Sequence, residues 1–367
     1  MKKIVDNRMG WILLVEDYEK NYAHLEVYTT EYEICSEVRI SGVLDYGNGF
    51  LLCYLLEEKN KMGLYTYGVQ VKSVQKEFKF DESKYTKDGY CFKDGLIGEL
   101  MALFSVFFQA RFYLKATNGF FTSPNEQIRR LRHKNEFHYR KPHPFFNYEM
   151  FSDQKRNWAY QNGLGEFLDT FKNIDGQYHQ SIIRAFYWYA ESIKEIGVDH
   201  QLFFIKMVSS VEALLKYIDI PKDDFPEKIK MVINKQVFNG EQKDEIEKWL
   251  QNRKIRQKFS IFLSQYSKGF FKGRRWKAKH CHIYRNDVAL FAKKIYDARS
   301  AYLHVGNPMY LSDDLTSDFA KTWDLDVSMG MMVDRKEYSA KEKLPRTRWF
   351  ERITNHCLKS FMGSIQL

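Results

Sequence analysis

Two patterns of apolar and polar residues follow each other along the chain. From residue 1 to about residue 92, apolar and polar residues alternate, and turn residues separate the alternating segments. Alternation puts every second side chain on one face of a strand, so it predicts half-buried β-strands. The predicted strands are EICSEVRISGVL, GFLLCYLLEE and GLYTYGVQVKSVQKEFKF, and DYGNG is a predicted hairpin turn.

A long apolar segment comes next, and we expect residues 95–116 to form a buried helix. The segment GLIGELMALFSVFFQARFYL is interrupted by Glu99 and Arg111, which argues against a membrane span. TNGFFTSPNEQ is expected to break this helix. Residues 126–160 are basic, aromatic and irregular, and we interpret them as a linker or an interdomain element.

From about residue 163 the apolar residues recur at spacings of three and four, which is typical of amphipathic helices. Asp199 is a predicted N-cap, and Gly197 and Gly306 are predicted helix ends. The sequence therefore predicts an α+β protein, with a β-rich domain and linker in residues 1–160 and a helical bundle in residues 161–367. The predicted helices are GEFLDTFKN, YHQSIIRAFYWYAESIKEIG, DHQLFFIKMVSSVEALLKYI, PEKIKMVINKQV, GEQKDEIEKWLQNRKIRQKFSIFLSQYS, NDVALFAKKIYDARSAYLHV and RTRWFERITNHCLKSFMGSI.

Composition is consistent with two folded domains, and it also indicates where in the cell the protein is found. The 367 residues suffice for two ordinary domains, and 44% hydrophobic residues allow a sizeable core. The five cysteines are scattered without a CxxC spacing, which indicates reduced thiols rather than a disulfide framework. No apolar run follows the lysines of MKKIVDNRMGW, so we expect no signal peptide and a cytoplasmic protein.

Positive charge is concentrated in the second half of the chain. Residues 161–367 carry 34 Lys and Arg against 26 Asp and Glu, whereas residues 1–160 carry 23 against 21. Between Lys248 and Arg285 there are twelve basic residues and no acidic ones. Aromatic residues lie among them, including Phe259, Phe262, Tyr266, Phe270, Phe271, Trp276 and Tyr284.

Cations for phosphates and aromatic rings for bases are what a groove for single-stranded nucleic acid requires. The candidate RNA-binding residues are Lys272, Arg274, Arg275, Trp276, Lys277 and Lys279. In the alternative interpretation the aromatic rings pack inward and the basic residues form a solvated face. Both interpretations are open at the level of sequence.

The segment KKIYDARSAYLHVGNP contains candidate catalytic residues. Arg299 can hold a phosphate in a bidentate fork, and His304 can act as a general acid or base. Positions five apart on a straight helix differ by about 140° around the axis. The two side chains therefore converge only if the helix frays or turns near His304, or if a second chain contributes its own copy. The alternative is that Arg299 forms a salt bridge and His304 caps the helix.

Three elements in this order resemble the HEPN superfamily, and in particular its Apea-like branch. They are RAFYWYAESI, then MVSSVEALL with Glu212 as its acidic residue, then Arg299, Ser300, AYL and His304 followed closely by Gly306. The resemblance covers roughly residues 165–367. It implies a helical bundle that dimerises, with two motifs facing each other across the interface.

The resemblance also implies a metal-independent endoribonuclease that serves in bacterial defence against phage, where RNA cleavage halts the infected cell. We expect the 2′-hydroxyl of RNA to be the nucleophile and a cyclic phosphate to be a product. Arg299 is expected to stabilise the phosphate, His304 to move the proton, Ser300 to position one of them, and Glu212 to orient Arg299. The N-terminal domain is expected to be a sensor or regulator, with a phage-derived molecule as a conceivable trigger.

Two other functions are compatible with the same residues. One is a non-catalytic HEPN module that binds RNA or a partner protein, and the other is a structural protein whose basic face binds DNA. The histidines of HCHIYR and HKNEFHYRKPHP do not have the spacing of a zinc site. The chain also contains no Gly-rich phosphate loop, no GxSxG and no HExxH. We therefore expect neither a metal nor another cofactor, and no membrane partner.

Overall fold

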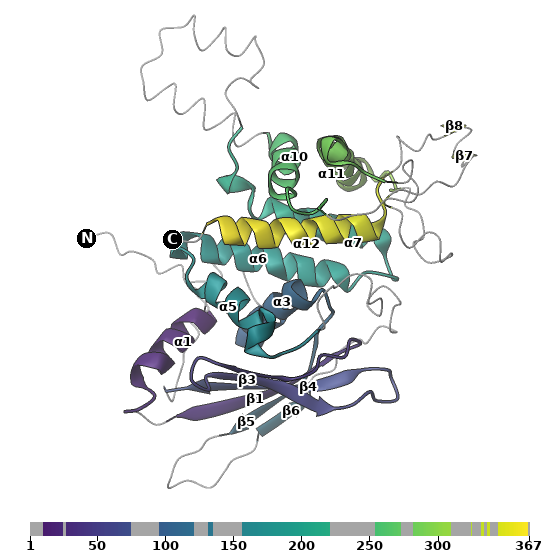
Figure 1. The fold of residues 1–367 in the computed structure, drawn as a ribbon. Coiled ribbons are helices and arrows are strands. Elements are labelled where there is room, and N and C mark those ends of the chain that lie inside the picture. Colours follow the sequence, from purple (N-terminus) through teal and green to yellow (C-terminus); the bar gives the residue numbers. More distant parts are fainter. Residues whose placement is uncertain are drawn as a thin grey trace, which may run out of the picture. The chain divides into compact units, whose positions relative to one another are not determined.

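The chain has a sheet in its first part and helices after it, which confirms the predicted α+β class (Figure 1). The computed structural model describes residues 10–24, 27–74, 95–120, 131–134, 156–220, 254–272, 282–309, 324, 332–333, 336–337 and 344–365. Contacts divide the chain into two compact units, Met1–Gly197 with Met362–Leu367, and Val198–Phe361. The domain boundary expected at residue 160 stays a prediction, because a contact-defined unit is not a test of independent folding.

The first unit contains a six-stranded antiparallel sheet in the order β2-β3-β4-β1-β5-β6. The predicted strand segments supply its first four strands, and the predicted turn DYGNG connects β2 to β3. Gly47, Asn48 and Gly49 have φ angles of 64°, 55° and 80°, in the left-handed region that glycine and asparagine tolerate best. The strands are β1 (Tyr28–Ser36), β2 (Val43–Tyr46), β3 (Leu51–Glu57), β4 (Tyr65–Ser73), β5 (Tyr113–Phe120) and β6 (Leu131–Lys134).

A helix precedes the sheet where the sequence predicted only strands. Helix α1 (Gly10–Asn21) buries Trp11, Val15 and Tyr18, which lie one turn apart on one face. The Trp11 ring stacks on that of Phe171, with centroids 5.8 Å apart. The apolar residues of this segment therefore follow the helical period, which the strand prediction overlooked.

The predicted helix over residues 95–116 is too long. Helix α3 runs over Gly95–Phe108, and β5 begins at Tyr113, so TNGF continues the strand instead of breaking a helix. A continuous apolar run has no period that separates a buried helix from a buried strand. Strand pairing determines the structure after residue 112. Tyr113 lies opposite Cys35 and Leu114 opposite Ile34, both in strand β1.

The two charges in this apolar segment are matched inside the protein. Glu99, fully buried in α3, accepts a hydrogen bond from the backbone N–H of Trp11 at 3.4 Å. Arg111 and Glu37 form an ion pair in which both side chains are completely buried. Arg111 Nε donates to Glu37 Oε1 at 2.7 Å, Nη2 donates to Oε2, and Nη1 donates to the Ile196 carbonyl at 3.5 Å.

Where the structure describes residues 126–160, they are not irregular throughout, and the expected linker or interdomain role of the range stays a prediction. Residues 131–134 form β6, and Trp158 is fully buried against Phe104 and Tyr67. The backbone N–H of Trp158 donates to the Ser41 carbonyl at 2.8 Å, which ties this segment to the sheet. Trp158 is thus a core residue of the first unit, since a single indole ring buries a large apolar area.

Helices of the predicted bundle complete the first unit. Helix α5 (Leu164–Lys172) follows the 3₁₀ turn η2 (Tyr160–Asn162), and α6 (Gly176–Ile193) packs against α3. The Asp175 side chain caps α6 by accepting from the Gln177 N–H at 3.0 Å. The first helix of the expected HEPN-like region therefore belongs to the same compact unit as the sheet.

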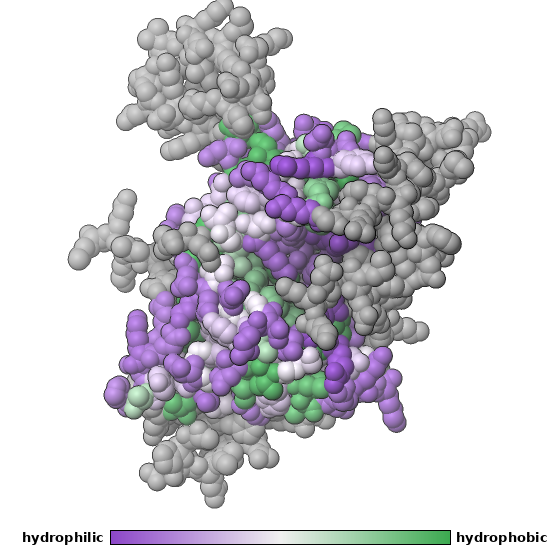
Figure 2. Space-filling model, in the orientation of Figure 1, coloured by the Kyte–Doolittle hydropathy of each residue, from purple (hydrophilic) through white to green (hydrophobic). Residues whose placement is uncertain are grey.

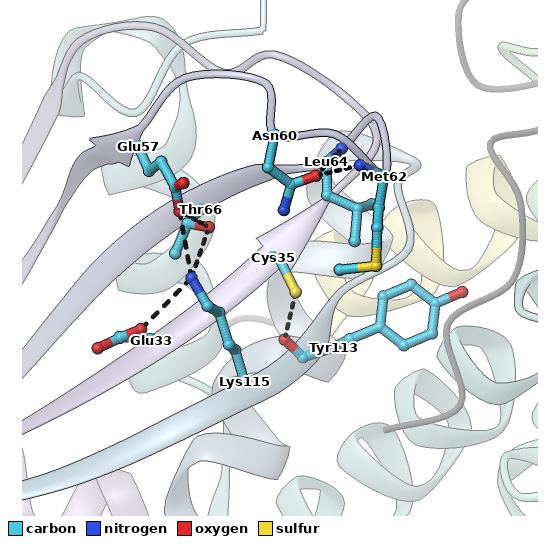
Figure 3. A network of polar contacts seen from close by, with 9 residues as sticks. All are labelled: Glu33, Cys35, Glu57, Asn60, Met62, Leu64, Thr66, Tyr113 and Lys115. Carbon is cyan, nitrogen blue, oxygen red and sulfur yellow. Dashed lines mark hydrogen bonds and ion pairs between the residues drawn. The ribbon is translucent and has the colours of Figure 1, made fainter. Parts of the chain in front are cut away.

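A polar network ties four strands of the sheet together (Figure 3). Lys115 of β5 lies 3.6 Å from a Glu33 oxygen, 3.2 Å from a Glu57 oxygen and 3.3 Å from the Thr66 hydroxyl. Beside it, the Cys35 thiol donates to the Tyr113 carbonyl at 3.6 Å. Cys35, Cys53 and Cys357 are buried and free, whereas Cys91 and Cys281 lie outside the described residues.

The second unit is helical (Figure 1). Aromatic rings of α7, α10 and α12 pack together in its core. The Asp199 cap of α7 is confirmed, because its side chain accepts from the Leu202 N–H at 2.9 Å. The predicted helix PEKIKMVINKQV and the first part of the next one lie outside the described residues. The elements are α7 (His200–Glu212), η3 (Leu215–Tyr217), α10 (Ile255–Tyr266), η6 (Arg285–Asp287), α11 (Val288–Val305), β7 (Met332–Val333), β8 (Lys336–Glu337) and α12 (Thr347–Ser364).

Within the described ranges, no helix is long and apolar enough to cross a membrane. The most apolar helix, α3, has 14 residues, and nearly all of them are buried in the first unit. Hydrophilic residues occupy much of the described surface that Figure 2 shows, with smaller apolar areas between them. The apolar run that resembled a span in length is thus a core helix followed by a strand.

Replacing Arg111 with Met should destabilise the protein by about 3–5 kcal/mol, because the Glu37 carboxylate would stay buried without its cation. Urea unfolding followed by circular dichroism measures the loss. The double variant Glu37→Leu/Arg111→Met should recover much of it, since neither charge of this pair then remains buried. As a control, Arg39→Met removes the exposed pair with Glu58 and should leave the unfolding midpoint unchanged. A single Arg111→Met variant as stable as the wild type would contradict this account.

Candidate active site on helices α7 and α11

Helix α11 carries the arginine–histidine motif and stays helical through its whole length. It runs to Val305 and ends at Gly306, whose φ of 77° lies in the left-handed region. The Gly306 N–H donates to the Tyr302 carbonyl at 3.1 Å, and the Asn307 N–H donates to the Ala301 carbonyl at 3.4 Å. The helix therefore does not fray before His304, and this route to bringing Arg299 and His304 together within one chain is absent.

Arg299 is held by an acidic residue from the neighbouring helix. Its Nη2 donates to Oε2 of Glu212, the last residue of α7, at 2.9 Å. The side chains of Arg299 and Glu212 are 17% and 23% exposed. The pair is thus largely shielded from water but still reaches the surface, where a ligand can approach it.

Tyr296 is a third member of this cluster, and the sequence analysis missed it. Its hydroxyl donates to Glu212 Oε1 at 3.2 Å, and the Arg299 guanidinium lies 5.8 Å from its ring centroid. Residues three apart lie on the same face of a helix, so the spacing Tyr-x-x-Arg was the available signal. Phe259 of α10 supports the other residues by packing on the Tyr296 ring, with centroids 5.7 Å apart.

Burial dominates the electrostatics of the cluster. It raises the pKa of the Glu212 carboxyl above its usual value, while the Arg299 charge and the Tyr296 hydrogen bond act in the opposite direction. The pKa of Tyr296 is also raised, first by burial and then by the Glu212 charge. The phenol consequently stays protonated at neutral pH and remains a hydrogen-bond donor.

The Arg299 guanidinium keeps donor groups that Glu212 does not use. The hydrogen bond to Glu212 engages Nη2 alone, and Nε is buried without a hydrogen-bond partner in the described part of the chain. A guanidinium carries five N–H groups in a planar fork that matches a carboxylate or phosphate. The arrangement can therefore hold an anion next to Glu212 without breaking the internal pair.

Ser300 and His304 are not part of this cluster within one chain. Ser300 is half-buried and His304 is exposed in the last turn of α11, between the exposed residues Leu303 and Val305. Among the described residues, Arg299 makes its hydrogen bond to Glu212 and not to either of them. Of the four predicted catalytic residues, the structure brings together Arg299 and Glu212.

The basic segment is described only at its edges. Arg274, Arg275, Trp276, Lys277 and Lys279 lie outside the described residues, and Lys272 is exposed shortly after α10. Their expected contact with RNA stays a prediction.

Base stacking by Phe259 and Phe262 is wrong, because both side chains are fully buried in the helical unit. They lie three apart on the inner face of α10, and Phe262 packs on Phe361 with centroids 5.8 Å apart. Tyr284, by contrast, is 40% exposed. The inward-packing interpretation therefore holds for the aromatic residues of α10.

The histidines that follow the basic segment were weighed as metal ligands. His282 is buried with its Nδ1 3.4 Å from Asp324 Oδ2, and the same carboxylate oxygen accepts from the Ile283 N–H at 3.1 Å. Among the described residues, no group of three or more His, Cys, Asp and Glu side chains is placed to hold a metal ion. His280 and Cys281 lie outside those residues.

Comparison of the chain with protein-family models, with curated proteins and with solved structures finds no match. The HEPN resemblance therefore stays an expectation that rests on its three sequence elements. The geometry of Arg299, Glu212 and Tyr296 stands independently of it.

Replacing Phe259 with Ala should destabilise the helical unit by about 3–5 kcal/mol, because it leaves a cavity between α10 and α11. Tyr284→Ala serves as the matched control on an exposed ring and should cost less than about 1 kcal/mol. Thermal unfolding of both variants measures the difference. Equal melting temperatures for the two variants would mean that Phe259 is not a core residue.

Proposed function

We propose that this protein is a metal-independent endoribonuclease of the HEPN type. The observation that carries the proposal is the environment of Arg299: its Nη2 donates to Glu212 at 2.9 Å, and among the described residues its guanidinium makes no second hydrogen bond. An arginine held in this way is suited to a phosphate whose charge grows during the reaction. The order of the three HEPN-like sequence elements supports the same conclusion.

In the proposed reaction the 2′-hydroxyl oxygen of RNA attacks the adjacent phosphorus and the bond to the 5′-oxygen breaks. His304 accepts the proton of the 2′-hydroxyl, and the leaving 5′-oxygen takes a proton from water, whose hydroxide is then neutralised by the protonated His304. Arg299 stabilises the negative charge on the phosphate oxygens in the transition state. Ser300, next to Arg299, positions one of these groups. The products are a 2′,3′-cyclic phosphate and a 5′-hydroxyl.

We propose a site shared by two chains, and the geometry of α11 supports it. On the regular helix α11, His304 lies about 7.5 Å along the axis and about 140° around it from Arg299. A two-fold axis that pairs two copies of α11 places the arginine of one chain opposite the histidine of the other. Leu303 and Val305, which are 47% and 71% exposed beside His304, are suitable contacts for such a second copy.

The biological setting of the proposal comes from the resemblance. It places the enzyme in the cytoplasm of a bacterium as a toxin-like antiviral defence protein that responds to a phage-derived trigger. The unit that contains the sheet would be the sensor or regulator. The basic segment from Lys248 to Arg285 would supply phosphate contacts for the RNA substrate.

A second candidate is a non-catalytic module that binds RNA or a protein through the same surface. One observation favours it. Within a single chain, Arg299 donates its hydrogen bond to Glu212, and His304 is exposed and does not contact Arg299. Turnover in the assembled protein distinguishes the two candidates.

Arg299→Ala and His304→Ala should each abolish cleavage of a labelled RNA in EDTA, because each removes one half of the shared site. Mixing the two inactive variants, after unfolding and joint refolding, should restore activity. In a mixed dimer one of the two sites then contains both native residues. Gel analysis of the cleaved RNA, with light scattering for the dimer, measures this.

Two results would contradict the shared site. Wild-type cleavage by either single variant would exclude its residue from the chemistry. Restored activity must also depend on mixing different variants, so refolded Arg299→Ala alone is the control. If the variants cleave neither alone nor together although the wild type does, the site lies within one chain.

Changing Arg274, Arg275 and Lys277 to Glu should weaken RNA binding strongly and flatten its salt dependence, because phosphate contacts release counterions. Trp276→Ala should reduce binding by about 1–3 kcal/mol where the ring stacks on a base. Fluorescence anisotropy at several salt concentrations measures both, and melting temperatures are taken on the same variants. A lower melting temperature with unchanged RNA affinity would identify Trp276 as a core residue.

A further inference from the structure

The proposed chemistry assigns no role to Tyr296, yet this residue contacts both charged members of the cluster. Its hydroxyl donates to Glu212 Oε1, while Arg299 donates to Oε2 of the same carboxylate. Each oxygen thus has a donor of its own, and both donors come from α11. The carboxylate is held at two points instead of one.

The position of Glu212 explains why a second donor matters. Glu212 is the last residue of α7, where the partial negative charge of the helix end disfavours a carboxylate. Burial disfavours its charged form as well. Two hydrogen bonds offset these costs and fix the plane of the carboxylate, which a single bond to Arg299 leaves able to rotate.

Tyr296 also acts on Arg299 directly. The guanidinium lies 5.8 Å from the ring centroid, within the range of a cation–π contact. Phe259 packs on the ring from α10 and is fully buried, so the ring itself has a rigid support. Arg299 is therefore confined by Glu212 at its Nη2 group and by an aromatic ring.

We propose that Tyr296 is a positioning residue for the phosphate-binding arginine. It does not touch the substrate, but it keeps Glu212 and Arg299 in the one arrangement that presents the remaining guanidinium N–H groups to a phosphate. This role rests on the proposed function for its effect on catalysis. The confinement of Arg299 by Tyr296 is a property of the folded chain and is tested without any substrate.

The first experiment measures the reactivity of Arg299 toward phenylglyoxal, which modifies accessible and mobile guanidinium groups, by mass spectrometry of the full-length protein. Tyr296→Leu should raise the modification rate about threefold relative to Arg285, the exposed arginine before α11, since the ring contact is lost. In Tyr296→Phe, which keeps the ring and lacks the hydroxyl, the modification rate of Arg299 should lie between those of Tyr296→Leu and the wild type. An unchanged rate in Tyr296→Leu would overturn the positioning role.

The second experiment measures cleavage of a fluorescein-labelled single-stranded RNA of mixed sequence. Tyr296→Leu should lower kcat about tenfold with little change in KM, because misplacing a group that acts in the transition state affects the chemical step. Tyr296→Phe should recover part of the rate. In a Glu212→Gln background, Tyr296→Phe should have a smaller effect than in the wild type, since the two residues act as one unit.

Tyr302→Phe is the matched control on the same helix, because in the described residues the Tyr302 hydroxyl makes no side-chain hydrogen bond. It should match the wild type in both experiments, and equal melting temperatures for all variants exclude unfolding as the cause. If the wild type cleaves no RNA while Arg299 reactivity changes as expected, the proposed function fails and the confinement stands. If RNA is cleaved and Tyr296→Leu retains the wild-type kcat, the positioning role fails and the proposed function stands.

Discussion

A buried arginine must be matched by a buried acid, and in the first unit the Arg111–Glu37 pair meets this requirement. Arg111 lies between α3 and β5, Glu37 follows β1, and the Ile196 carbonyl, which also accepts from Arg111, follows α6. One guanidinium thus joins the sheet, the helix-to-strand connection and the end of a second helix. A charge without its partner at this point would be costly enough to disturb all three elements.

The second unit uses the same pair of residue types for a different purpose. Arg111 donates to both oxygens of Glu37 and has no exposure, whereas Arg299 uses one nitrogen for Glu212 and is 17% exposed. The first pair is saturated, so it contributes to structure alone. The second leaves donors available near the surface, and Tyr296 takes the carboxylate oxygen that a bidentate arginine would otherwise use. That difference, rather than the presence of an arginine, makes Arg299 a candidate for anion binding.

Sequence patterns predicted most of the elements whose periods were distinct. The amphipathic spacing and the caps identified α6, α7, α11 and α12, including the Asp199 cap and the Gly306 end. The predictions failed where the spacing of apolar residues does not distinguish a helix from a strand. The apolar run after residue 95 begins as helix α3 and ends in strand β5, because Tyr113 and Leu114 pair with β1, about 80 residues earlier in the chain. Trp158 and Tyr296 were missed for a similar reason, since their roles depend on contacts between distant segments.

The regularity of α11 also constrains how the proposed enzyme is controlled. Gly306 ends the helix after His304, so neither fraying nor a bend brings the histidine to Arg299 in one chain. Under the proposed function, a single chain then presents Arg299 to a phosphate, but its own His304 does not lie beside that arginine. Activity would depend on pairing two copies of α11, and therefore on concentration or on whatever promotes that pairing. If the proposal holds, this geometry would restrain a nuclease that is harmful to its own cell before any regulatory domain acts, because each separated chain would have only part of the shared site.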